Sequence, residues 1–289
     1  MRRSFADGRI PWWLRVLLAV DRVVGGVREL EYACLDRLVC LLVAPSDRAK
    51  VTAFAYRAQG QYLPGSRFHE EGLRAWELAA IGTPPFPQSG HILLGAAGGG
   101  RELRALCELG YSVTAFEPVT ELLAGARSVC DKYPTARVVQ GSYADLVEHS
   151  RGGNGPFDGV LDRPVDGVVL GLASITHVVE ETDRLDLLRA LRVLASEAPI
   201  FLSYNAFDQG TDTGGPGRRT RAVQAALARL GVRTPEFPRG LGYTPDFGFR
   251  YVFEAHEIAE LAAAGGYRVH TSTLRDFPHA VLVPDSVAE

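Results

Sequence analysis

The stretch HILLGAAGGGRELRALCELGYSVTAFEP, residues 91–118, carries the strongest structural signal in this chain. It begins with an apolar run at 92–94, which suits a strand buried on both faces of a parallel sheet. Four glycines follow between 95 and 100, and such a turn lets backbone approach a ligand because no Cβ intervenes. A helix and a second strand come next, and the strand ends at Glu117. This order predicts a nucleotide-binding βαβ unit.

The two ends of the predicted unit suggest how a nucleotide would be held. The N-terminus of the helix and the free N–H groups of the turn would receive the polar part of the ligand. Glu117, followed directly by Pro118, would accept hydrogen bonds from ribose hydroxyls.

The glycines fit two registers that predict different nucleotides. Read as a dinucleotide fingerprint, the best register is Gly95-x-Ala97-x-x-Gly100, one residue short of the full pattern. Starting at Gly98 instead places Leu103 where close packing of helix on strand favours Gly or Ala. If the first register is the working one, the chain is an NAD-dependent oxidoreductase.

In the second register, the stretch resembles motif I of class I S-adenosylmethionine-dependent methyltransferases, acid-x-Gly-x-Gly-x-Gly. Ala96 takes the first glycine place and Gly98 and Gly100 take the other two, while Leu94 stands where that family usually carries an acid. Glu117 matches the ribose-binding acid of the family. The resemblance implies S-adenosylmethionine as cofactor and a small molecule as methyl acceptor.

The resemblance also implies further cofactor contacts after the third and fourth strands. In the family, the turn after strand three usually starts with an acid that contacts the adenine amine. Ser142 holds that place here, so this contact is expected from Asp145 or from backbone, with Tyr143 stacked on adenine. The full predicted cofactor-binding set is Gly95, Ala96, Ala97, Gly98, Gly100, Glu117, Pro118, Ser142, Tyr143, Asp145 and Gly171.

His177 is the predicted general base. It follows the fourth strand, expected at 165–170, and ligands of open parallel sheets bind outside the carboxyl ends of the strands. Ser-x-x-His after this strand also resembles a pattern of small-molecule methyltransferases. His177 would take the proton of an oxygen or nitrogen acceptor, with Tyr204 and Asn205 after strand five as orienting groups. The alternative role of His177 is to fix its loop by hydrogen bonds.

The predicted fold is α/β, a Rossmann-like seven-stranded sheet whose C-terminal hairpin is antiparallel, preceded by an N-terminal helical extension. The hairpin is expected at 267–271 and 280–283, as in class I methyltransferases. We assign the core to 89–289, with a cap insertion at about 206–253. The insertion begins with a long loop suited to a lid, continues with the basic run 218–221, and ends in the aromatic segment 240–253, predicted to wall the acceptor pocket.

Residues 1–88 are predicted to form a helical extension that covers the cleft or mediates dimerisation. From Trp13 to Leu41, apolar positions recur every three or four residues, and only Glu31 interrupts them, which predicts a heptad-like seam. The seam packs either on its own domain or on a second copy, and we predict a homodimer through residues 12–42. A further helix is expected over 70–81, with nearby aromatic side chains either in the core or at the substrate site.

Composition excludes several other classes of protein. The 289 residues carry a formal net charge of −3, which gives no case for nucleic-acid binding. No apolar span approaches the ~20 residues of a membrane helix, so stable membrane insertion is not expected. The 4 cysteines lack metal-ligand spacing, which predicts no metal site and indicates buried thiols in a reducing, cytoplasmic compartment. A non-catalytic methyltransferase-like subunit stays open, because Leu94 and Ser142 replace expected acids.

Overall fold

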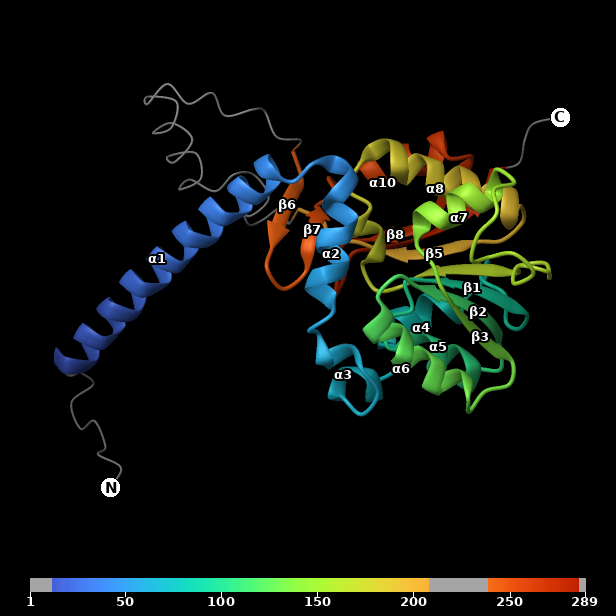
Figure 1. The fold of residues 1–289 in the computed structure, drawn as a ribbon, viewed down its shortest axis with the longest axis horizontal. Coiled ribbons are helices and arrows are strands. Elements are labelled where there is room, and N and C mark those ends of the chain that lie inside the picture. The colour runs from blue at the N-terminus through green and yellow to red at the C-terminus, as the bar shows by residue number, and fades with distance from the viewer. Residues whose placement is uncertain (1–11, 208–238, 286–289) are drawn as a thin grey trace.

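The computed structural model describes residues 12–207 and 239–285 (Figure 1). At its centre is a seven-stranded sheet with the order β3-β2-β1-β4-β5-β9-β8. The first five strands in this order, β3, β2, β1, β4 and β5, are parallel to one another, and β9 runs antiparallel to both β5 and β8. The strands are β1 (His91–Gly95), β2 (Ser112–Glu117), β3 (Ala136–Gln140), β4 (Gly167–Leu170), β5 (Ile200–Ser203), β8 (Tyr267–Thr273) and β9 (His279–Pro284). The predicted fold class is confirmed.

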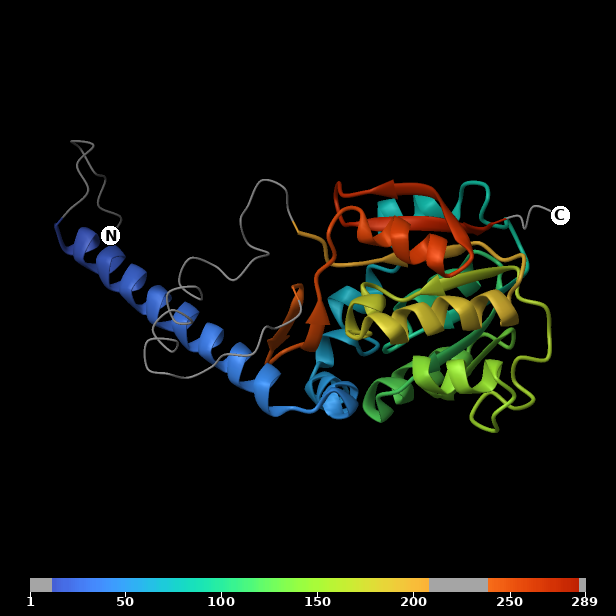
Figure 2. The same ribbon diagram turned by 90° about the horizontal axis from the view of Figure 1, so that it is seen from above.

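Helices cover both faces of the sheet because successive side chains of each buried strand point to opposite sides. Ile92 and Leu94 pack in the cluster that contains residues of α4 (Ala75–Ile81), α5 (Arg101–Glu108) and α6 (Thr120–Cys130). Leu93 packs in the cluster that contains residues of α7 (Tyr143–Ser150), α8 (Glu181–Leu194) and α10 (Glu257–Ala264). The sheet therefore lies between two helical layers (Figure 1), and Figure 2 looks down on the layer of α7, α8 and α10.

The chain before the sheet consists of a long helix and several short ones. Besides α4, they are α1 (Trp12–Leu42), α2 (Arg48–Tyr56) and α3 (Arg67–Glu70), with 3-10 turns at Pro45–Asp47 and Gly60–Tyr62. Both ribbon views show α1 extending away from the sheet.

The C-terminal part of α1 packs on a small hairpin, β6 (Leu241–Thr244) and β7 (Gly248–Tyr251). The Tyr243 N–H donates to the Asp36 carboxylate at 2.6 Å. Cys40 is buried beside Leu241 and Phe249 in a separate small core.

The single helix predicted over 70–81 is wrong, because the structure has two helices there. α3 ends at Glu70 and α4 begins at Ala75. Between them Gly72 has a φ of +64°, a left-handed conformation that an α-helix cannot continue through. The carbonyl of Gly72 instead accepts a hydrogen bond of 2.7 Å from the Arg101 guanidinium.

Part of the predicted insertion lies outside the described residues. This applies to most of the loop predicted as a lid and to the basic run 218–221, since the structure describes nothing between 207 and 239. None of the helices within the described ranges is long and apolar enough to cross a membrane.

Candidate active site

The turn after β1 has left-handed backbone at alternate residues. Ala96, Gly98 and Gly100 have φ values of +52°, +56° and +96°. These are the three glycine places of the methyltransferase register, whereas Gly95 and Ala97 of the dinucleotide register are not left-handed. Left-handed backbone favours glycine because it lacks a Cβ, so the conformation of the turn supports the methyltransferase register.

Two glycines of this turn have opposite surroundings. A Cβ placed on Gly98 would meet nothing within 4 Å, so this residue faces open space. A Cβ on Gly99 would lie 2.0 Å from the carbonyl oxygen of Tyr62. The N-terminal segment therefore crosses directly over the turn and closes one side of the site.

Glu117 ends β2 beside this turn and is almost fully buried, at 3% exposure. One carboxylate oxygen accepts from the Gly98 N–H at 2.8 Å, and the other accepts from the Val119 N–H at 2.9 Å. A carboxylate offers about four lone-pair positions, so acceptor capacity is left for two ligand hydroxyls. Burial raises the pKa of the Glu117 carboxyl to about 7, although both N–H groups favour its charged form.

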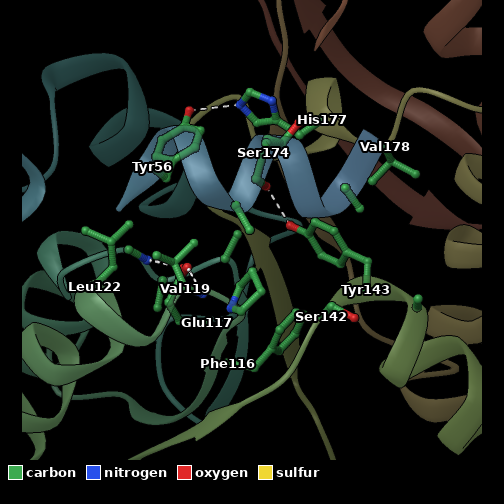
Figure 3. Close-up of a pocket in the computed structure, with 18 of the residues that line it drawn as sticks. Tyr56, Phe116, Glu117, Val119, Leu122, Ser142, Tyr143, Ser174, His177 and Val178 are labelled. Atoms are coloured by element: carbon green, nitrogen blue, oxygen red, sulfur yellow. Dashed lines mark hydrogen bonds between the residues drawn. The ribbon is translucent and has the colours of Figure 1, made fainter. Parts of the chain in front are cut away.

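A cavity of about 530 Å³ connects the glycine turn with α2 and with the loop after β4 (Figure 3). Its volume lies within the range of small-molecule sites. Eight of the predicted site residues line it, and they are Ala96, Ala97, Gly98, Glu117, Pro118, Ser142, Tyr143 and His177.

Three predicted cofactor contacts lie behind the cavity wall, because Gly95, Gly100 and Gly171 do not line it. The Gly171 N–H donates to the Gly95 carbonyl at 2.8 Å. A Cβ on Gly171 would come within 2.5 Å of the Ala96 carbonyl oxygen. We therefore assign Gly171 to the close packing of β4 against the turn, and Gly100 likewise faces Val129 and Ala126 of α6.

Asp145 is exposed and takes part in a capping box, which contradicts its assignment to the adenine amine. Its carboxylate accepts from the Ser142 N–H at 2.8 Å and from the Ser142 hydroxyl at 2.7 Å. Asp145 does not line the cavity, whereas Tyr143 does, and the Tyr143 hydroxyl lies 2.5 Å from that of Ser174.

Tyr204 and Asn205 are not orienting groups in this structure. The Tyr204 side chain is fully buried in the core and packs edge-on against Phe253. Asn205 is held by its backbone, with its N–H donating to the Thr176 hydroxyl at 3.1 Å and its carbonyl accepting from Phe253. Neither residue lines the cavity. The end of β5 turns into the protein here, which strand position alone does not reveal.

His177 lies on the cavity wall with both ring nitrogens engaged. Nδ1 lies 2.8 Å from the Phe249 carbonyl oxygen, and Nε2 lies 2.9 Å from the Tyr56 hydroxyl (Figure 3). A carbonyl only accepts hydrogen bonds, so Nδ1 carries the proton and Nε2 accepts from Tyr56. Burial lowers the pKa of His177, and the ring is therefore neutral near pH 7.

A buried ionic network lies beside the glycine turn. The Arg101 guanidinium binds both carboxylate oxygens of Glu77, at 2.8 and 2.6 Å, and donates to Glu102 at 2.7 Å. The side chains of Arg101, Glu77 and Glu102 are 3%, 2% and 8% exposed. Arg101 and Glu102 line the cavity and Glu77 lies behind them, so the network beside the site has two carboxylates for one guanidinium.

Three aromatic residues of the N-terminal segment line the cavity, although the sequence favoured core packing for them. Tyr56, Tyr62 and Phe68 line the cavity. Trp76 instead stacks on Phe277 with ring centroids 5.4 Å apart.

The aromatic segment 240–253 does not wall the cavity as predicted but lies behind it. Its Phe247 ring packs 6.2 Å from that of Tyr56, and its Phe249 carbonyl holds His177.

The far end of the cavity is rich in charge. Arg48 pairs with Glu180 at 2.5 Å, and Arg151 pairs with Asp186 at 2.7 Å. Glu148 and Asp183 also line this end. Within the described part of the chain, no cluster of His, Cys, Asp and Glu is arranged to hold a metal ion.

Comparison with known proteins places this arrangement in a fold family. No protein-family model matches the sequence, and no curated protein matches it. Solved structures do match. A S-adenosylmethionine-dependent methyltransferase from Methanosarcina mazei has a TM-score of 0.51 at 13% identity, covering 75% of this chain and 99% of its own.

Two further structures agree with the first. 1,6-didemethyltoxoflavin-N1-methyltransferase from Burkholderia thailandensis, with S-adenosylhomocysteine bound, has a TM-score of 0.54 at 18% identity, covering 85% of this chain and 92% of its own. A S-adenosylmethionine-dependent methyltransferase from Clostridium acetobutylicum has a TM-score of 0.51 at 11% identity, covering 72% of this chain and 89% of its own. The chain therefore has the class I S-adenosylmethionine-dependent methyltransferase fold, as the resemblance in motif I implied.

Proposed function

We propose that the protein transfers a methyl group from S-adenosylmethionine to a small-molecule acceptor. The observation that carries this proposal is the Glu117 carboxylate, which lines a cavity of about 530 Å³ and is held by Gly98 of the left-handed turn. The Glu117 carboxylate, which can accept hydrogen bonds from ligand hydroxyls, therefore lies next to Gly98, whose backbone faces open space. The Glu117–Gly98 pair would bind the ribose, and the cavity continues to α2, where an acceptor would lie.

Charge favours S-adenosylmethionine over NAD at this site. Arg101 is already bonded to Glu77 and Glu102, so it has little free charge for an anionic pyrophosphate. The excess carboxylate suits a ligand that carries a sulfonium and an ammonium group instead. Opposite charges in a partly buried site attract strongly because the effective dielectric is low. The antiparallel β9 also fits the methyltransferase fold.

The bound cofactor supplies an electrophilic methyl group that an acceptor attacks in line. Much of the catalysis in such a transfer comes from holding the two reactants in the correct geometry. In this chain the cavity walls would position the acceptor, and His177 would accept the proton of an oxygen or nitrogen acceptor at Nε2. A non-catalytic subunit has no need of a base on the cavity wall, so His177 favours an enzyme.

A ligand panel tests the proposed function. The melting temperature of the protein should rise with S-adenosylmethionine and with S-adenosylhomocysteine but not with NAD, because a ligand stabilises only the folded state that binds it. A rise with NAD alone would contradict the proposal. If none of the three ligands raises the melting temperature, the result would favour the non-catalytic subunit.

Glu117→Ala is expected to weaken S-adenosylmethionine binding by about 1.5–3 kcal/mol, the scale of hydrogen bonds to a charged group. Isothermal titration calorimetry measures this loss. Glu121→Ala is the matched control, since Glu121 is exposed on α6 and pairs with Arg57. Unchanged affinity in a folded Glu117 variant would remove Glu117 from the cofactor site.

The same titration has an expected pH dependence. The pKa of Glu117 is raised to about 7 by burial, and ribose hydroxyls donate to the charged carboxylate. Affinity should therefore be constant above pH 7 and fall by up to about tenfold per pH unit below it, as protons compete with the ligand. Glu117→Gln should remove this dependence, because an amide does not titrate.

We also propose that the protein is a homodimer through α1. The side chains of Val20, Val24, Val27, Leu38 and Leu41 are 45–61% exposed along this helix. Soluble monomers rarely expose contiguous apolar surface, and positions spaced by three and four suit packing against another helix. A second copy is the simplest partner because one patch then serves both chains.

Light scattering tests the dimer. The full chain should have the mass of two copies, and Val27→Glu should shift it toward one copy. Val193→Glu is the control. The Val193 side chain is 67% exposed, similar to the 61% of Val27, but it lies on α8. A monomeric full chain at micromolar concentration would contradict the dimer.

We also propose that the protein works in a reducing compartment and on a small-molecule acceptor. The free thiols at Cys34, Cys40, Cys107 and Cys130 suit a reducing compartment such as the cytoplasm. The net charge of −3 gives no attraction to nucleic acid, so a small-molecule acceptor fits better.

A further inference from the structure

The Tyr56 hydroxyl is hydrogen-bonded to Nε2 of His177, the ring nitrogen with which His177 would accept a proton as a base. It lies 2.9 Å from Nε2, and the two rings meet edge to face with centroids 5.3 Å apart. The two residues are 121 positions apart, on α2 and on the loop after β4. Both line the cavity. An acceptor in this cavity would therefore meet a tyrosine hydroxyl together with the imidazole.

The direction of the hydrogen bond follows from the other contacts of His177. The Phe249 carbonyl fixes the proton of the neutral ring on Nδ1, so Nε2 must accept. The Tyr56 hydroxyl is then the donor, and its oxygen keeps acceptor capacity, part of which the neighbouring Tyr62 hydroxyl engages. Burial raises the pKa of Tyr56 and lowers that of His177, so both groups are neutral near pH 7.

Two charged groups among the residues that the structure describes influence the pKa values of this pair. The charge of Glu117 raises the pKa of Tyr56, and Arg250 on β7 lowers the pKa of both Tyr56 and His177. Tyr62, whose ring lies 5.6 Å from that of Tyr56, also raises the pKa of Tyr56.

The strand that holds His177 and the helix that carries Tyr56 are hydrogen-bonded to each other. The Phe249 N–H donates to the Thr52 hydroxyl at 3.0 Å, one turn before Tyr56 on α2. A Cβ on Gly248 would lie 2.5 Å from the Thr52 Cα, so β7 and α2 are in backbone contact. The carbonyl that holds His177 and the helix that carries Tyr56 thus keep a fixed separation, and such fixed geometry favours proton transfer along the pair.

We propose that Tyr56 is a second catalytic residue, which contacts the acceptor and passes the acceptor's proton to His177. The acceptor X–H gives its proton to the Tyr56 oxygen as the Tyr56 proton moves to His177 Nε2. X bonds to the methyl carbon, and the electrons of the broken carbon–sulfur bond stay on sulfur. His177 becomes an imidazolium whose Nδ1–H remains bonded to the Phe249 carbonyl. The inference rests on the proposed methyl transfer and concerns acceptors with a proton on oxygen or nitrogen.

The hydrogen-bond arrangement can be tested without any acceptor. In the full chain labelled with ¹⁵N-histidine, the His177 ring should show a protonated Nδ1 and an unprotonated, hydrogen-bonded Nε2 at pH 7. Tyr56→Phe should shift the Nε2 resonance, while Tyr133→Phe, a matched change at a tyrosine that donates to Glu108 and does not line the cavity, should leave it in place. A protonated Nε2 in the neutral ring, or no shift in Tyr56→Phe, would overturn the proposal.

Catalysis by Tyr56 can be tested by the rate of S-adenosylhomocysteine formation with a panel of phenols, anilines and aliphatic amines. Tyr56→Phe should lower kcat by about 10²-fold, the low end for proton-transfer catalysis, and leave the Kd of S-adenosylmethionine within about twofold. Residues that act as a unit have non-additive effects, so Tyr56→Phe with His177→Ala should be no slower than His177→Ala alone. A Tyr56→Phe variant as fast as the original chain would show that Tyr56 merely shields His177 and is displaced by the acceptor.

Failure of this inference is distinguishable from failure of the proposed function. If calorimetry shows no S-adenosylmethionine binding by the original chain, the methyltransferase proposal fails, whatever the histidine spectrum shows. If the cofactor binds and turns over but Tyr56→Phe changes neither the spectrum nor kcat, only the role of Tyr56 is lost.

Discussion

Arg101→Met is expected to lower the free energy of unfolding by about 3–5 kcal/mol, the usual cost of removing one partner from a buried ionic network. Glu77 and Glu102 would lose the guanidinium that bonds to them at 2.6–2.8 Å, and two buried carboxylates would face each other without a cation. Methionine retains much of the side-chain volume, so the loss measures charge more than packing. Chemical denaturation provides the measurement.

Two further variants show whether the charge network causes this loss. Arg67→Ala removes the exposed pair with Glu71 and should cost at most about 1 kcal/mol. Adding Glu77→Gln and Glu102→Gln to Arg101→Met should recover part of the loss, since uncharged partners no longer need a cation. If Arg101→Met is as stable as the original chain, the network does not stabilise this end of the sheet.

His177→Ala is expected to lower the rate of methyl transfer by about 10²–10⁴-fold, the range for loss of a general base. Cofactor affinity should be nearly unchanged, because the predicted ribose contact is made by Glu117. In the original chain, burial holds the pKa of His177 below 6.5, so at saturating S-adenosylmethionine, where the protonation of Glu117 does not limit the rate, activity should persist at pH 6.5 and decline as His177 becomes protonated at lower pH. Initial rates of S-adenosylhomocysteine formation across pH measure both effects.

His256→Ala serves as the control for His177→Ala, because the His256 side chain is 66% exposed on the surface. It should leave the rate unchanged. If His177→Ala turns over at the original rate with an oxygen or nitrogen acceptor, positioning alone supports the transfer and His177 only fixes its loop.

The fold was predictable because its signals are local. The apolar run at 92–94, the glycine turn and the acid at Glu117 lie within one βαβ unit, and the short strands near the C-terminus have turn residues on both sides. The error over 70–81 arose at Gly72, where a tertiary contact with Arg101 stabilises a left-handed residue inside an otherwise helical pattern.

The candidate site was predictable only where the strand end itself makes the contact. Glu117, the last residue of β2, lines the cavity together with Gly98 and His177, which lie in the turns after β1 and β4. Asp145 was misassigned although Ser-x-x-Asp before an apolar residue is a recognisable capping box, a signal that could have excluded it.

Other site residues had no comparable signal in the sequence. Glu102 reaches the cavity from the first turn of α5, and Tyr56 reaches it from a helix far from the sheet in sequence. Tyr204 follows β5 as expected, yet it points into the core. These positions depend on how distant segments pack, which a single sequence does not encode in any local pattern.

The sequence separations within the site imply an order of formation during folding. Gly98 and Glu117 are 19 positions apart, so the hydrogen bond at the proposed ribose contact closes a short loop. The proposed base is held by contacts of Tyr56 with His177, His177 with Phe249, and Thr52 with Phe249, over 121, 72 and 197 positions. Closing longer loops costs more chain entropy, and Phe249 on β7 comes after β5 in the sequence. A partly synthesised chain that ends after β5 would therefore contain every residue of the ribose contact, while His177 would still lack the carbonyl that fixes its proton.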